Sequence, residues 1–134
     1  MALPPLPRPY QDTETYWAAA RDHRFVIQHC KSCGKHQFYP RGVCSHCLSS
    51  DLEWHEASGK GTVYSFSVNH RAPHPGFADE IPFVLAIVEL EEGPRMMTNI
   101  VECDPDTVAV GMKVKLLMCE SEGGQKVPVF KPAV

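Results

Sequence analysis

Apolar residues in the second half of the chain fall into five short runs, separated by turns rich in glycine and proline. These runs are rich in Val, Ile, Leu, Met and Phe, and such runs bounded by turn residues are typical of β-strands. The expected strands are 62–68, 82–90, 95–101, 113–119 and 127–130. Five strands without a long helical pattern predict a small closed barrel of the OB type, with one helical turn at 104–108.

Strict alternation in the first of these strands predicts which side chains enter the barrel. Tyr64, Phe66 and Val68 share one face, and Val63 and Ser65 share the other. We expect Tyr64 and Phe66 in the barrel core, since alternating aromatic residues in a strand are usually buried. The alternative is that they line a binding site for an apolar ligand.

The first half of the chain begins differently. Residues 1–12 are rich in proline and are expected to be extended. Residues 13–22 carry Tyr16, Trp17 and Ala20 at helical spacing, which predicts a short amphipathic helix. Two large aromatic side chains on so short a helix need a cover. Either they pack on the chain itself, or Tyr16 and Trp17 contact a partner protein.

Two cysteine pairs follow in the pattern C-x2-C-x10-C-x2-C, formed by Cys30, Cys33, Cys44 and Cys47. Two residues between paired cysteines let a tight turn direct both sulfurs at one ion, and two such turns complete a tetrahedron. Four thiolates leave no open position, so the pattern predicts a structural Zn²⁺ site. Iron in a rubredoxin-like site is the chemical alternative. Nearby His29, His36 and His46 could also be ligands, but we expect them on the solvated surface.

Strands are expected at 24–29, 37–40 and 52–56, around the two cysteine pairs. Alternating strands and cysteine turns are typical of a zinc ribbon, which is too small to fold without its metal. The predicted protein is therefore mainly β: an extended segment (1–12), a helix and rubredoxin-like zinc ribbon (13–58), and a five-stranded OB-fold barrel (59–134).

Composition narrows the possible functions. The net charge is −3, and residues 61–134 hold six Lys/Arg against ten Asp/Glu, so a nucleic-acid partner is not expected. The longest apolar run, 83–88, is too short to span a membrane. No secretory signal is recognised, which favours the cytoplasm, where six cysteines bind metal rather than form disulfides.

Beyond these patterns, the chain resembles a known family. A four-cysteine ribbon is followed by the segments 61–66 (GTVYSF), 70–73 (HRAP), 75–77 (PGF), 88–94 (VELEEGP) and 128–132 (PVFKP). These features are similar to the DUF35 family, whose members have a zinc ribbon and an OB fold and are associated with acyl-CoA enzymes. The chain departs from the family pattern at two positions. His23 stands where a glycine is usual after the helix. Leu48 follows the second cysteine pair, whereas Gly34 follows the first.

The resemblance implies a non-catalytic accessory subunit in a hetero-oligomer with a thiolase-like enzyme, a thiolase-like aldolase or a hydratase. It also implies possible contact with an acyl-CoA thioester, for which the loop residues His70, Arg71, His74 and Phe77 are the candidates. Two alternatives are a stand-alone acyl-CoA-binding protein and a nucleic-acid-binding OB fold. Independent catalysis through His70, His74 and Asp79 is disfavoured, because no nucleophile with a paired base is visible.

Overall fold

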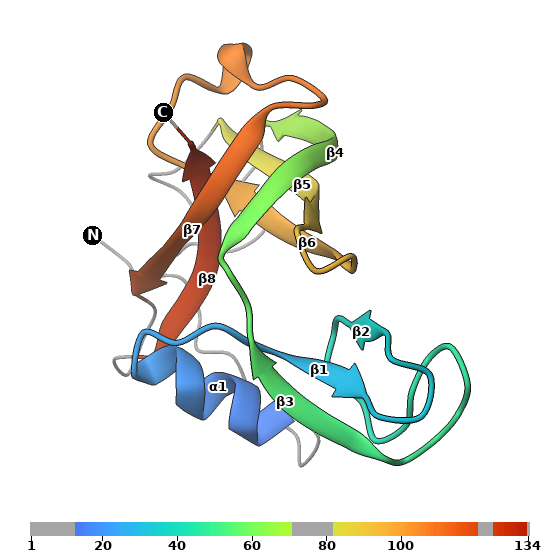
Figure 1. Cartoon of the computed structure of the whole chain (residues 1–134). Coiled ribbons are helices and arrows are strands. Elements are labelled where there is room, and N and C mark those ends of the chain that lie inside the picture. The colour runs from blue at the N-terminus through green and yellow to red at the C-terminus, as the bar shows by residue number, and fades with distance from the viewer. Residues whose placement is uncertain (1–12, 71–81, 121–124, 134) are drawn as a thin grey trace.

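The computed structural model describes residues 13–70, 82–120 and 125–133. A helix lies where a small sheet meets a larger barrel (Figure 1). Helix α1 spans Glu14–Arg21, and the small sheet contains β1 (Val26–Cys30), β2 (His36–Gln37) and β3 (Leu52–Glu56) in the order β2-β1-β3. The predicted mainly-β class, with one N-terminal helix, a ribbon and a five-stranded barrel, is confirmed.

The barrel closes in the order β4-β5-β6-β8-β7. Its strands are antiparallel except where β6 meets β8 in parallel. The turn expected at 104–108 is a 3-10 helix, η3 (Pro105–Thr107). The strands are β4 (Lys60–Asn69), β5 (Phe83–Leu90), β6 (Arg95–Ile100), β7 (Lys113–Glu120) and β8 (Lys126–Pro132).

Burial in the barrel follows the two-residue period of a strand. Val84, Ala86, Val88 and Leu90 of β5 are buried, and the residues between them are half-buried or exposed. Strand β6 shows the same alternation. These inward side chains fill the barrel, as expected for a small closed sheet.

Strand β4 corrects the expectation for Tyr64 and Phe66. A β-bulge interrupts its pairing with β5 between Val63 and Ser65, which shifts the alternation of faces. Val63 is fully buried, whereas Tyr64 is 50% and Phe66 36% exposed. The prediction that both aromatic residues belong to the barrel core is therefore wrong.

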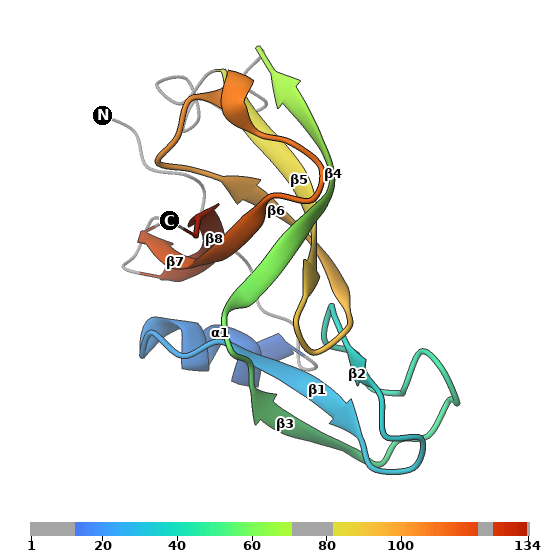
Figure 2. The ribbon, with the colours of Figure 1, turned by 45° about the horizontal axis from the view of Figure 1, so that its top comes forward.

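One hydrophobic core joins the two parts of the molecule. Tyr16, Phe25 and Ile27, from α1 and the start of β1, belong to the same buried cluster as the inward residues of the barrel. The rings of Phe25 and Phe130 meet edge to face at 6.5 Å. Figure 2 shows α1 and the small sheet lying together at one end of the barrel.

Gln125 attaches the helix to the last strand. Its side chain is 1% exposed and accepts a hydrogen bond from Arg21 Nε at 2.7 Å. Its own Nε2 donates to the backbone oxygen of Trp17 at 3.0 Å. This buried amide thus fixes the position of α1 against the entry of β8. No helix among the described residues is long and apolar enough to cross a membrane.

Candidate metal centre

Two similar cysteine turns bring four sulfur atoms together. In the first, the amide of Gly34 donates to the oxygen of Cys30 at 2.9 Å. In the second, the amide of Leu48 donates to the oxygen of Cys44 at the same distance. Strand β1 ends at Cys30, so the sheet itself delivers the first sulfur.

The sulfur atoms have the spacing that a tetrahedral metal requires. Cys30 Sγ lies 3.6 Å from Cys47 Sγ, and Cys33 Sγ lies 3.7 Å from Cys44 Sγ. A tetrahedron with zinc–sulfur bonds near 2.3 Å has edges of about 3.8 Å. All six cysteines are free, and the four sulfurs lie within 4.8 Å of one another. The four thiols therefore fit Zn²⁺, and the set leaves no open position.

The pKa values of the clustered thiols diverge. At Cys33 and Cys47, a backbone hydrogen bond that lowers the pKa is outweighed by desolvation and by hydrogen bonds to neighbouring sulfurs, so the pKa is raised, whereas the pKa of Cys44 is lowered. Cys44 is buried, which alone would raise the pKa of its thiol. At Cys44, this desolvation is outweighed by hydrogen bonds from the backbone amides of His46 and Cys47, and the pKa falls to about 6. A metal ion needs deprotonated sulfur, so the low pKa of Cys44 favours its role as a ligand.

The two departures from the family pattern both fall at left-handed backbone positions. Leu48 has φ of 64° and occupies the place that Gly34, at 79°, has in the first turn. His23, just after α1, has φ of 60°. Both residues accept a conformation that favours glycine, and the 77% exposed Leu48 side chain gains little burial in return.

The histidines near the cysteines separate into two groups. His46 is exposed. His29 and His36 are half-buried and meet His55 of β3, so the expectation of a solvated surface is wrong for these two. Sequence reasoning missed His55, because only the pairing of β1 with β3 brings it close. Glu53 and His55 alternate along β3, and this spacing alone does not indicate a metal site.

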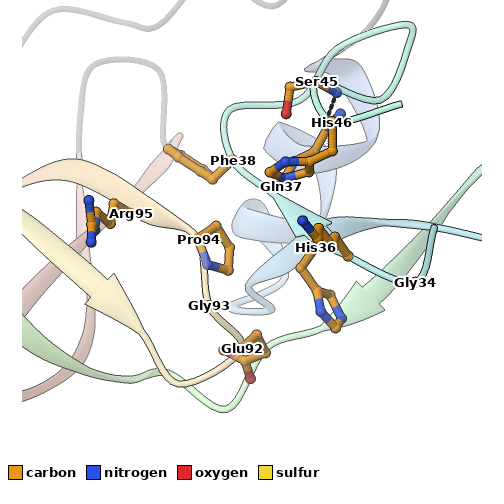
Figure 3. A pocket seen from close by; sticks show the side chains of 11 residues that line it. Gly34, His36, Gln37, Phe38, Ser45, His46, Glu92, Gly93, Pro94 and Arg95 are labelled. Atoms are coloured by element: carbon orange, nitrogen blue, oxygen red, sulfur yellow. Dashed lines mark hydrogen bonds between the residues drawn. The ribbon is translucent and has the colours of Figure 1, made fainter. Parts of the chain in front are cut away.

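A cleft of 420 Å³ lies between the ribbon and the turn that joins β5 to β6 (Figure 3). His36 and Gln37 line one side, and Glu92 and Pro94 line the other. The pKa of His36 is lowered, mainly because burial disfavours its cation and secondly because His29 is near; Glu92 acts in the opposite direction.

A second cleft, of 480 Å³, lies where α1, the ribbon and the barrel meet. We call it the Trp17 cleft and define it by Trp17, Tyr39, Arg95 and Met97. Met97 is 64% exposed, and Trp17 Nε1 donates to the Tyr39 hydroxyl at 2.9 Å. Tyr16 is only 3% exposed and packs on its own chain, so its ring is not available at the surface.

The candidate ligand residues of the loop after β4 are described only in part. His70 is exposed at the end of that strand. Arg71, His74 and Phe77 lie outside the described residues, as does Asp79. Their proposed contact with an acyl-CoA thioester stays a prediction.

Comparison with known proteins gives matches over most of the chain. The family described as "ChsH2, rubredoxin-like zinc ribbon domain" matches residues 17–53. The family described as "ChsH2, C-terminal OB-fold domain" matches residues 54–118.

Two curated relatives carry different names. A "Probable enoyl-CoA hydratase alpha subunit" of Thermomonospora curvata is 44% identical over 133 residues, which are 99% of this chain and 41% of the relative. A "DUF35 domain-containing scaffold protein" of Methanocaldococcus jannaschii is 45% identical over 87 residues, which are 64% of this chain and 61% of the relative. The chain therefore spans less than two thirds of the length of either relative.

A solved structure described as "Ltp2-ChsH2(DUF35) aldolase" contains a chain with the same fold. The two superpose with a TM-score of 0.86 at 43% identity, over 96% of this chain and 100% of the other.

Proposed function

Because the chain belongs to the DUF35 family of zinc-ribbon and OB-fold proteins, we propose that it is an accessory subunit of an acyl-CoA-processing enzyme. It binds a thiolase-like aldolase or a hydratase and does not itself catalyse the reaction. The observation that carries this proposal is the close match, over its whole length, to a chain from an aldolase described as an Ltp2–ChsH2 protein. The hydratase alpha-subunit name of a relative supports the same role.

The metal centre supports a structural role. Cys30, Cys33, Cys44 and Cys47 would hold Zn²⁺ with four thiolates, so the metal would stabilise the ribbon and offer no position to a substrate. Its four sulfurs would come from the two turns that flank β2, so the metal would hold these turns together. Zinc rather than iron in this site is checked by elemental analysis of the purified protein.

The Trp17 cleft is the surface that we propose for the partner enzyme. Interface cores are enriched in aromatic residues, Met and Arg, and the cleft combines Trp17, Tyr39, Met97 and Arg95. The guanidinium of Arg95 also lies 3.9 Å from the ring centroid of Tyr64, which extends the exposed surface toward β4. An exposed apolar surface of this kind on a small protein often marks an interaction site.

Co-expression with candidate thiolase-like aldolases and hydratases tests the proposal. A complex of defined mass should be seen by size-exclusion chromatography with light scattering, and the subunit alone should turn over no acyl-CoA. Met97→Glu should weaken the complex at least about tenfold, because it places a charge in a desolvated contact. Val110→Glu is the matched control, since Val110 is 68% exposed and lies before β7, outside the cleft.

Two outcomes would contradict the proposal in different ways. A chain that binds none of these enzymes but binds an acyl-CoA by calorimetry would be a stand-alone binding protein. A complex that survives Met97→Glu as well as it survives Val110→Glu would leave the accessory role standing and remove the Trp17 cleft from the interface.

A further inference from the structure

Three imidazoles gather on the ribbon sheet, on the side of β1 opposite its metal-facing cysteine. His29 and Cys30 are successive residues of a strand, so their side chains point to opposite faces. His29 pairs across the sheet with His36 of β2. The ring of His55, from β3, stacks on that of His29 at 4.3 Å between centroids.

The carboxylate of Glu53 holds two of these rings. Its Oε2 lies 3.1 Å from His29 Nδ1 and 3.4 Å from His55 Nε2. Each of the two rings thereby uses one nitrogen on the carboxylate, and the other nitrogen of His55, Nδ1, faces His36. Metal-bound histidines very often donate their second ring N–H to a carboxylate, which fixes the tautomer and the orientation.

The three histidines offer ring nitrogens close enough to one another for a shared ion. His36 Nε2 lies 3.2 Å from His55 Nδ1. A tetrahedron with zinc–nitrogen bonds near 2.0 to 2.1 Å has edges of about 3.3 Å. One nitrogen from each of the three histidines falls within a group no wider than 4.8 Å. Three strands of a sheet therefore bring one nitrogen each within 4.8 Å of the other two, and a small closure of the group would let them share an ion.

The surroundings add negative charge. His36 lines the cleft that Glu92 closes from the barrel side (Figure 3). Glu92 Oε2 accepts a hydrogen bond from the Ser58 amide at 2.7 Å. Its Oε1 is buried and has no hydrogen-bond partner among the described residues. A buried carboxylate oxygen of this kind is a place where a water or a cation can bind.

We propose that His29, His36 and His55 form a second metal site, for a divalent cation such as Zn²⁺ or Co²⁺, oriented by Glu53 and open toward the cleft. Three histidines and an open position differ from the closed four-thiolate centre, so this ion would exchange and could accept an outside ligand. The inference is independent of the proposed accessory role, because it concerns only the ribbon.

Metal stoichiometry tests the site in the full-length chain. The protein is first loaded with one equivalent of zinc, and protection of the four metal-centre thiols from a thiol reagent shows that this zinc occupies the four-cysteine site. It is then dialysed against micromolar Zn²⁺ or Co²⁺. Wild type should hold two metals per chain by elemental analysis. The second Co²⁺ should show visible d–d bands without the thiolate charge-transfer band.

Variants assign the second metal to the cluster. His36→Ala and His55→Ala should hold one metal, with unchanged thiol protection. Glu53→Gln keeps all three histidines and should weaken the second metal by about 10- to 100-fold. His23→Asn removes an exposed histidine outside the cluster and suits its left-handed backbone, so it should still hold two.

The proposal is overturned if wild type holds one metal, or if the second metal survives in the His36→Ala and His55→Ala variants. Equal loss in His23→Asn would also overturn it. If the alanine variants do not fold, the affinity of Glu53→Gln decides, and a value equal to wild type would refute the site.

Discussion

The ribbon and the barrel are both made of short, mostly antiparallel strands, yet they are held together by different forces. The barrel buries a continuous set of apolar side chains, among them Val63, Val88, Val114 and Phe130. In the ribbon, no residue of β3 is buried, and two of the most deeply buried positions are Cys30 and Cys44. The barrel is thus stabilised by hydrophobic burial, and the ribbon depends on its metal.

Loss of the metal should produce the largest difference in stability between the ribbon and the barrel. Cys44→Ser, or chelation of the wild type, should unfold the ribbon, since structural zinc contributes about 10–16 kcal/mol in zinc-finger peptides. Hydrogen exchange should then show amides of β1 and β3 exposed while those of β5 and β6 stay protected. Cys119→Ser, on β7 outside the metal centre, is the control. A ribbon that stays protected in Cys44→Ser would show that burial alone holds it.

A substitution in the core that the two regions share should destabilise the ribbon and the barrel together. Phe130 is fully buried in the barrel, and its ring meets Phe25 of the ribbon side. Phe130→Ala should cost about 3–5 kcal/mol and destabilise both regions, because it leaves a cavity where they join. Urea unfolding followed by circular dichroism measures the cost.

Val110→Ala, at a 68% exposed position, is the control and should change the unfolding free energy by less than about 0.5 kcal/mol. If Phe130→Ala lowers the protection of the barrel amides alone, the ribbon and the barrel do not share one cooperative core.

The smallest expected effect lies inside the ribbon. Leu48→Gly should stabilise the ribbon by up to about 1 kcal/mol, because glycine adopts φ of 64° without strain. Gly34→Ala should have the opposite sign at the equivalent turn, although an added Cβ would meet nothing within 4 Å. The zinc-release midpoint against a chelator measures both. Equal midpoints for the two variants would mean that backbone strain does not limit the ribbon.

Sequence reasoning succeeded where the signal is local. The pattern of the cysteines predicted a compact four-sulfur cluster, because each pair is held by one turn. The helix 13–22 was confirmed as Glu14–Arg21 for a similar reason, since its apolar spacing is a short-range property.

It failed where side chains meet across strands. The cluster of His29, His36 and His55 depends on the register of three strands, which no local pattern sets. Tyr64 points outward because Val63 before it points into the barrel, and the bulge that follows breaks the alternation. A register change of one residue moves side chains to the other face, so simple alternation misplaced two aromatic residues.

The buried Gln125 has a consequence for the order of folding. Its partners on the helix, Arg21 and the backbone of Trp17, precede it by 104 and 108 residues. During synthesis the helix leaves the ribosome long before β8, the strand that receives it. The ribbon can bind its metal long before then, whereas the apolar face of the helix must wait. The contacts of the helix with Gln125 can therefore form only after the barrel strands between them have been made.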